Sequence, residues 1–156
     1  MSTIATWSRS CITNTARLAK GWNFEHDTVG YNYRMPNLNA ALGCAQLEQL
    51  DGFLANKRAL AARYAVAFKS IDGVTFFTEP DFARSNYWLN VLLLDPALAD
   101  ARDAVLAATN AAGLETRPAW TLMHRLPMYR DNPRDDLPVA EAIAARLINL
   151  PSGPAL

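Results

Sequence analysis

Residues 74–94 read VTFFTEPDFARSNYWLNVLLL, and this stretch contains two segments that are typical of β-strands. The first, residues 74–78, is rich in valine, threonine and phenylalanine and ends at Glu79-Pro80. The second, residues 87–94, is almost entirely apolar and ends at Asp95-Pro96. β-Branched and aromatic residues are enriched in strands, and proline interrupts strand pairing. The stretch therefore predicts a β-sheet in the second half of the chain.

The segment that precedes this sheet has the pattern of two helices, or of one long helix with a break. Pro36 suits a first helical turn, where its missing N–H costs nothing. Gly52 is expected to bend or interrupt the helical region. The first part carries apolar residues at helical spacing, mostly on one side, namely Leu38, Ala41, Leu42, Ala45 and Leu50. The second part carries an apolar stripe with a spacing of four residues, formed by Leu60, Tyr64 and Phe68.

Helix and strand signals alternate after residue 95. Residues 97–112 are rich in alanine and are followed by Gly113, as expected at the end of a helix. Residues 114–117 predict a short strand that Pro118 ends. The chain then passes through a predicted loop, and a last helix is expected to begin near Pro138 and to include residues 147–150.

The order of these elements predicts the fold class. A helix pair followed by strand, strand, helix, strand and helix indicates an α+β fold with a small, mostly antiparallel sheet and flanking helices. We expect three parts, which are a poorly defined segment at residues 1–24, a loop and helix pair at 25–72, and a small α+β domain at 73–156.

The composition excludes several classes of protein. Hydrophobic residues make up 51% of the 156 residues, so the chain can form a core. Fifteen basic residues balance 15 acidic ones, which argues against a protein that binds nucleic acid or an anionic membrane through its charge. The two cysteines, Cys11 and Cys44, form no CxxC pair and predict neither a disulfide framework nor a zinc site. We expect a cytoplasmic globular protein without a membrane span.

The most promising polar cluster lies at residues 26–37, which read HDTVGYNYRMPN. A helix that begins near Pro36 offers backbone N–H groups and the positive end of its dipole to an anion. Arg34 can bind a phosphate through two hydrogen bonds, and Asn32 would lie on the same side of an extended segment. The alternative is that Asn32 and Arg34 only satisfy the turn while the tyrosines pack.

Residues 26–51 resemble the segment that follows the cofactor-binding domain in DegT/StrS-type nucleotide-sugar aminotransferases, which depend on pyridoxal phosphate (PLP) and have PLP fold type I. The resemblance extends over about residues 12–153. It includes Tyr87-Trp88, residues 115–118, residues 122–124 and residues 149–152. The chain thus resembles the C-terminal part of such an enzyme, and within the family it is most similar to the branch that acts on keto sugars of the legionaminic acid or bacillosamine kind.

The resemblance implies roles for four residues. Asn32 and Arg34 would reach across a homodimer interface to the PLP phosphate of the neighbouring subunit. Arg117 and His124 would lie at the lip of the active site, where the nucleotide sugar enters. For His124, a structural role beside its apolar neighbours is the alternative.

The family requires a lysine that holds PLP as a Schiff base. No lysine of this sequence matches the family's motif for that residue. The three lysines, Lys20, Lys57 and Lys69, are each expected to be solvated surface residues. We therefore expect no catalytic residue in this chain, and a truncated aminotransferase that does not transaminate by itself. The alternatives are a non-catalytic module for dimerisation or binding, and a fragment of a related PLP-dependent sugar dehydratase.

Overall fold

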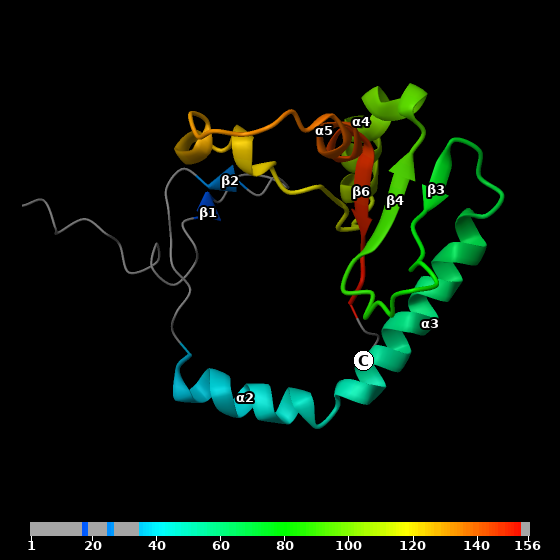
Figure 1. Ribbon diagram of the computed structural model, residues 1–156. Helices are drawn as coiled ribbons and strands as arrows, with labels where there is room; N and C mark the ends of the chain where they lie inside the picture. The colour runs from blue at the N-terminus through cyan, green and yellow to red at the C-terminus, as the bar shows by residue number, and fades with distance from the viewer. Residues whose placement is uncertain (1–16, 19–24, 27–34, 154–156) are drawn as a thin grey trace, which may run out of the picture.

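The computed structural model describes residues 17–18, 25–26 and 35–153 (Figure 1). Strands β1 (Arg17–Leu18) and β2 (Glu25–His26) form a short antiparallel ladder. The main sheet is formed by β3 (Val74–Phe76), β4 (Asn90–Leu94), β5 (Arg117–Pro118) and β6 (Leu147–Leu150). Its strand order is β3-β4-β6-β5, and each neighbouring pair is antiparallel. The predicted α+β fold with a small antiparallel sheet is confirmed.

The helical region before the sheet consists of α2 (Asn37–Leu47) and α3 (Leu50–Phe68). The break lies at Glu48 and Gln49, so the prediction that Gly52 interrupts the helix is wrong. Gln49 leaves the helical conformation with φ −106° and ψ 1°, whereas Gly52 falls in the first turn of α3. A glycine in the first turn costs little because the helix has barely begun there.

Residues 147–150 form a strand, and the prediction that they continue the last helix is wrong. Helix α5 (Pro138–Arg146) ends at Arg146, and β6 follows without a loop. The strand lies between β4 and β5 and pairs with both, so its backbone groups are satisfied on two sides. Ile148, Asn149 and Leu150 are buried there. Pairing and burial on both sides outweigh the helical pattern of the preceding residues.

Two other boundaries differ from the predictions in smaller ways. The strand expected at residues 87–94 begins only at Asn90, because Tyr87 has φ +46°, which is incompatible with an extended strand. Pro118 belongs to β5 instead of ending it, and the edge position of β5 tolerates a residue without an N–H donor. Gly113 has φ +80°, as a residue that follows a helix often does.

The remaining helical elements connect the strands. They are the 3₁₀ helix η1 (Pro96–Ala101), α4 (Arg102–Ala111), and two 3₁₀ turns, η2 (Met123–Arg125) and η3 (Pro127–Tyr129), within the predicted loop.

One face of the sheet forms the core. Successive residues of a strand point to opposite faces, and the register puts Leu92 opposite Ile148. The buried cluster on this face contains Leu92, Leu94, Ile148 and Leu150 together with Leu106 of α4, and Tyr64 and Phe68 of α3 pack against it. The other face carries the residues in between, which include Val91 and Asn149. Helices α3 and α4 thus cover one side of the sheet.

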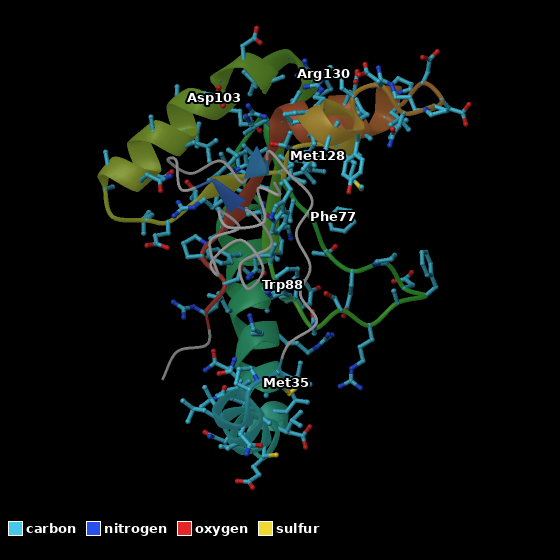
Figure 2. All side chains as sticks on the ribbon, turned by 90° about the vertical axis from the view of Figure 1, so that its left-hand side faces the viewer. Met35, Phe77, Trp88, Asp103, Met128 and Arg130 are labelled. Atoms are coloured by element: carbon cyan, nitrogen blue, oxygen red, sulfur yellow. The ribbon has the colours of Figure 1, made fainter. Side chains whose placement is uncertain are left out.

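Helix α2 packs differently from α3. It has no buried residue, and Leu38 and Leu42 are 80% and 61% exposed. Figure 1 shows that α2 extends away from the sheet, and Figure 2 labels the exposed Met35 beside it. The apolar stripe of this helix therefore has no cover within the described residues.

Candidate functional site

The four predicted site residues have different outcomes. Asn32 and Arg34 lie outside the described residues. Arg117 lies on β5 and His124 on η2. Arg117 lines a hollow of about 290 Å³ together with Trp120 and Ser152. His124 lines two other hollows. The structure therefore does not place Arg117 and His124 in the same hollow.

Arg117 is held by the end of α4. Its Nη1 donates hydrogen bonds to Oδ1 of Asn110 at 2.7 Å and to the carbonyl oxygen of Thr116 at 2.8 Å. Asn110 in turn donates through Nδ2 to Oγ1 of Thr116 at 3.0 Å. The Nη2 atom lies 3.7 Å from the carboxylate of Glu115, which is too long for a hydrogen bond. The guanidinium is thus held by Asn110 of α4 and by the residue before β5.

His124 is fixed to the first turn of α5. One ring nitrogen, Nε2, lies 2.9 Å from Oε1 of Glu141, and the His124 side chain is only 9% exposed. Nη2 of Arg125 lies 3.5 Å from the same oxygen. The hydrogen bond from His124, followed by the charge of Arg125, lowers the pKa of Glu141 from its ordinary value. This contact joins the loop after β5 to α5, so His124 has a structural partner.

Two tryptophans form a feature that sequence reasoning missed. Trp88 and Trp120 stack with their ring centroids 5.9 Å apart and their planes at 28°, although they are 65% and 43% exposed. Trp88, labelled in Figure 2, lies on the connection before β4. Trp120 also lines the hollow that contains Arg117. The only signal in the sequence is the Tyr87-Trp88 pair, which the apolar pattern places at the start of a predicted strand.

An ion pair orders the loop that precedes Trp88. Both Nη atoms of Arg58 on α3 bind the carboxylate of Glu79, and Nη1 also donates to the carbonyl oxygen of Ser85 at 2.6 Å. The backbone N–H of Ser85 donates to Oε2 of Glu79 at 2.5 Å. The hydrogen bonds from Arg58, and then that from Ser85, lower the pKa of Glu79. This carboxylate therefore ties the loop to α3.

Lys57 is not the solvated lysine that the sequence predicts. It is half-buried, and its Nζ donates to the carbonyl oxygens of Ser152 at 2.6 Å and of Trp88 at 3.4 Å. Lys69, which follows the last turn of α3, is exposed, as the sequence predicts.

The described residues contain neither a cluster of metal-ligating side chains nor a membrane-spanning helix. Within them, no group of three or more His, Cys, Asp or Glu side chains is arranged to bind a metal ion. No helix in the same part of the chain has the length and apolar character needed to cross a bilayer.

Comparison with protein families gives one family over most of the chain. The model of the DegT/DnrJ/EryC1/StrS aminotransferase family matches residues 7–156. The GDP-perosamine synthase of Escherichia coli O157:H7 is 37% identical over 139 residues, which are 89% of this chain and 37% of that protein. The GDP-perosamine synthase of Caulobacter vibrioides is 36% identical over 127 residues, which cover 80% of this chain and 34% of that protein. The chain spans about a third of the length of these relatives.

Solved structures share the fold. DesI in the presence of its TDP-sugar product has a TM-score of 0.71 and 28% identity, over 80% of this chain and 32% of that one. DesV from S. venezuelae in complex with a ketimine intermediate has a TM-score of 0.68 and 27% identity, over 94% of this chain and 38% of that one. The described elements therefore have the arrangement of one part of these proteins.

Proposed function

Because this chain belongs to the DegT/DnrJ/EryC1/StrS aminotransferase family, we propose that it forms the small-domain part of a PLP-dependent enzyme that moves an amino group from glutamate to a keto sugar on a nucleotide. The observation that carries the proposal is the family match over residues 7–156. The identity of 36–37% to two GDP-perosamine synthases supports it.

Asn32 and Arg34 are proposed to bind the phosphate of PLP in a neighbouring subunit. The phosphate is a dianion, and an unpaired dianion in a dry site would be costly. A planar guanidinium satisfies two phosphate oxygens at once, and an amide adds a third donor. When bound, PLP supplies the imine chemistry of amino transfer, and the role of these two residues is to hold and orient it.

Arg117 and His124 are proposed to contact the nucleotide sugar at the lip of the active site. Arg117 fits this role because its guanidinium is held by hydrogen bonds and the residue lines a hollow together with Trp120. His124 fits it less directly, because its Nε2 already has Glu141 as a partner. We therefore expect His124 to position the loop that surrounds the substrate.

A GDP-linked keto sugar is the first substrate to assay, since two relatives are named for GDP-perosamine. Keto sugars of the legionaminic acid or bacillosamine kind, which the sequence resemblance suggests, are the next to assay. Amination of the latter alone would place the chain in that branch.

A chimera tests this function. Residues 12–153 of this chain replace the matching segment of the E. coli O157:H7 synthase, and glutamate-dependent amination of a GDP-linked keto sugar is measured. We expect amination, and we expect R34A in the chimera to weaken PLP retention by about 1–3 kcal/mol, the scale of a lost charge-assisted hydrogen bond. Loss of water from the sugar without amination would instead indicate a dehydratase. A folded, PLP-loaded chimera that catalyses neither reaction would contradict the proposal.

A non-catalytic binding module is the second candidate, and the exposed apolar side chains of α2 favour it. Leu38, Leu42 and Leu47 are 80%, 61% and 68% exposed. Such a helix is typical of a surface that associates with another chain. Self-association of the isolated chain, measured with no PLP present, supports this reading.

A further inference from the structure

Residues 119–137, called the connecting loop below, join β5 to α5 and contain only the short turns η2 and η3. In Figure 1 this loop extends sideways from the sheet before it returns to α5. Of its residues, all of which the structure describes, only Leu126 is buried. A segment with so little buried surface opens at a low free energy, so a single contact can change how often it opens.

The backbone hydrogen bonds of the two turns close the loop on itself. The N–H of Leu126 donates to the carbonyl oxygen of Met123 at 3.1 Å, and the N–H of Tyr129 donates to that of Leu126 at 3.0 Å. Bonds between residues three apart shape the loop, but they do not attach it to the rest of the fold. The attachment therefore depends on side chains.

His124 attaches the connecting loop to the first turn of α5. Its Nε2 lies 2.9 Å from Oε1 of Glu141, and the histidine side chain is 9% exposed. His124 also lines two hollows, of about 330 Å³ and about 390 Å³. A hollow offers no packing contacts to its wall. The bond to Glu141 therefore has a large share in holding this part of the loop.

Several other titratable or charged groups surround this contact. Besides Glu141 of α5, they come from the connecting loop and are Arg125, Tyr129, Arg134, Asp135 and Asp136. Nη2 of Arg125 lies 3.5 Å from the Glu141 oxygen that His124 contacts, and Nη1 of Arg134 lies 3.4 Å from the carbonyl oxygen of His124. Of all these residue types, only histidine normally changes its charge between about pH 5 and about pH 8.

The strength of the contact depends on the protonation of the imidazole. A protonated His124 forms an ion pair with Glu141, and charge-assisted hydrogen bonds are about twice as strong as neutral ones. A neutral imidazole keeps one N–H for the bond but contributes no charge. Glu141 stays ionised over this range, because the hydrogen bond from His124 and the charge of Arg125 lower its pKa from the ordinary value of 4.5. Only the charge of the histidine therefore changes.

We propose that the contact between His124 and Glu141 is a pH-sensitive tie, which holds the connecting loop against α5 in mild acid and lets it open more often as the pH rises to about 8. In this role His124 is a positioning residue that sets the closed state of η2 and η3. The inference involves neither PLP nor a nucleotide sugar, so it does not rest on the proposed function.

Amide hydrogen exchange of the 156-residue chain tests the tie. Protection factors, which correct for the intrinsic pH dependence of exchange, are measured for Leu126 and Tyr129 at about pH 5.5 and about pH 8. We expect protection to be about two- to fivefold higher at the lower pH, as for an ion pair of modest strength. The N–H of Leu106, which lies in the core, reports global unfolding and should not follow this ratio.

Variants assign the effect to the pair. H124Q removes the titrating ring, and E141Q removes the carboxylate charge but keeps an acceptor, so each should abolish the difference between the two pH values. The matched control is H26Q, which replaces the other of the two histidines and should keep the ratio of the parent. R125Q should also keep it, because arginine does not titrate in this range.

Three results would overturn the proposal: equal protection of the loop at both pH values in the parent, a ratio that survives E141Q, or a ratio that disappears in H26Q. The side chain of Glu141 is 44% exposed, so E141Q answers the question even if H124Q does not fold. Protection of Leu106 shows that each variant is folded. Failure of the chimera to aminate a sugar would contradict the proposed function and would leave this result unchanged.

Discussion

The ammonium group of Lys57 on α3 lies 2.6 Å from the carbonyl oxygen of Ser152, a residue 95 positions further along the chain. Tyr64, two turns later on the same helix, donates its hydroxyl hydrogen to the carbonyl oxygen of Pro151 at 3.0 Å. The segment after β6 is thus held against α3 by two side chains. Ser152 also accepts through Oγ from the N–H of Asn90 at 2.8 Å, which joins this segment to β4.

Replacing Lys57 by methionine should destabilise the chain. Methionine keeps most of the aliphatic stem, but both carbonyl oxygens that Lys57 binds lose a charged donor. We expect the free energy of unfolding to fall by about 1–3 kcal/mol, as for hydrogen bonds to charged groups. Urea unfolding followed by circular dichroism measures this. K69M, at the exposed end of α3, is the control and should differ from the parent by less than about 0.5 kcal/mol.

Acid should weaken the tie between Glu79 and Arg58. The pKa of Glu79 is held below its ordinary value of 4.5 in the folded chain, chiefly by Arg58. Its contribution to stability is therefore complete above the ordinary pKa and is lost as the pH falls through the lower, folded pKa. Glu141, whose pKa is lowered by His124, changes stability in the same direction.

The measurement is the unfolding free energy of the parent and of E79Q between about pH 6 and about pH 3. E79Q should lose less stability than the parent over this range, because it has no carboxylate to protonate. E48Q, which removes a carboxylate beside α2, should keep the slope of the parent. Identical slopes for E79Q and the parent would show that the ion pair does not stabilise the fold.

Leu106 should be among the most sensitive core positions. It is fully buried and belongs to the cluster that joins α4 to β4 and β6. L106A should lower the unfolding free energy by about 2–5 kcal/mol, through lost burial and a cavity. L42A, the same change at a residue that is 61% exposed on α2, should change it by less than about 0.5 kcal/mol. Similar effects of the two variants would contradict the observed packing.

The helices and the first two strands of the main sheet could be predicted because their signals are local. Apolar periodicity indicates α2 and α3, and acid-proline pairs follow β3 and β4. Strand β6 could not be predicted, because four apolar residues after a helix fit either structure. The residues form a strand because they pair with β4 and β5, and these partners lie far away in the sequence.

The site residues that the sequence suggests come from contiguous motifs. Arg34 and Asn32 lie in one polar segment outside the described residues, and Arg117 lies in a short motif of the family. Trp88 and Trp120 stack although they come from different loops, and neither residue carries a local sign of its partner. The bond from Lys57 to Ser152 has the same long-range character.

The isolated chain should not form a Schiff base with PLP. Lys57, which has its ammonium group on two carbonyl oxygens, is not free to react. Purified chain mixed with PLP should show neither a saturable one-to-one absorption band nor glutamate-dependent turnover. A saturable band that disappears in K20A would contradict this and would identify Lys20 as the reactive lysine.

Helix α2 should mediate self-association. Leu38 and Leu42 are one turn apart, so they lie on the same face, and both are largely exposed. Two glutamates there, in L38E/L42E, would put charge into an apolar contact and should shift the chain toward monomer in sedimentation velocity runs over a range of concentrations. The matched control, A62E/V66E, places two glutamates with the same spacing at exposed positions of α3 and should not change the distribution. If the parent is a monomer at every concentration, or if both double variants dissociate it equally, α2 is not the contact surface.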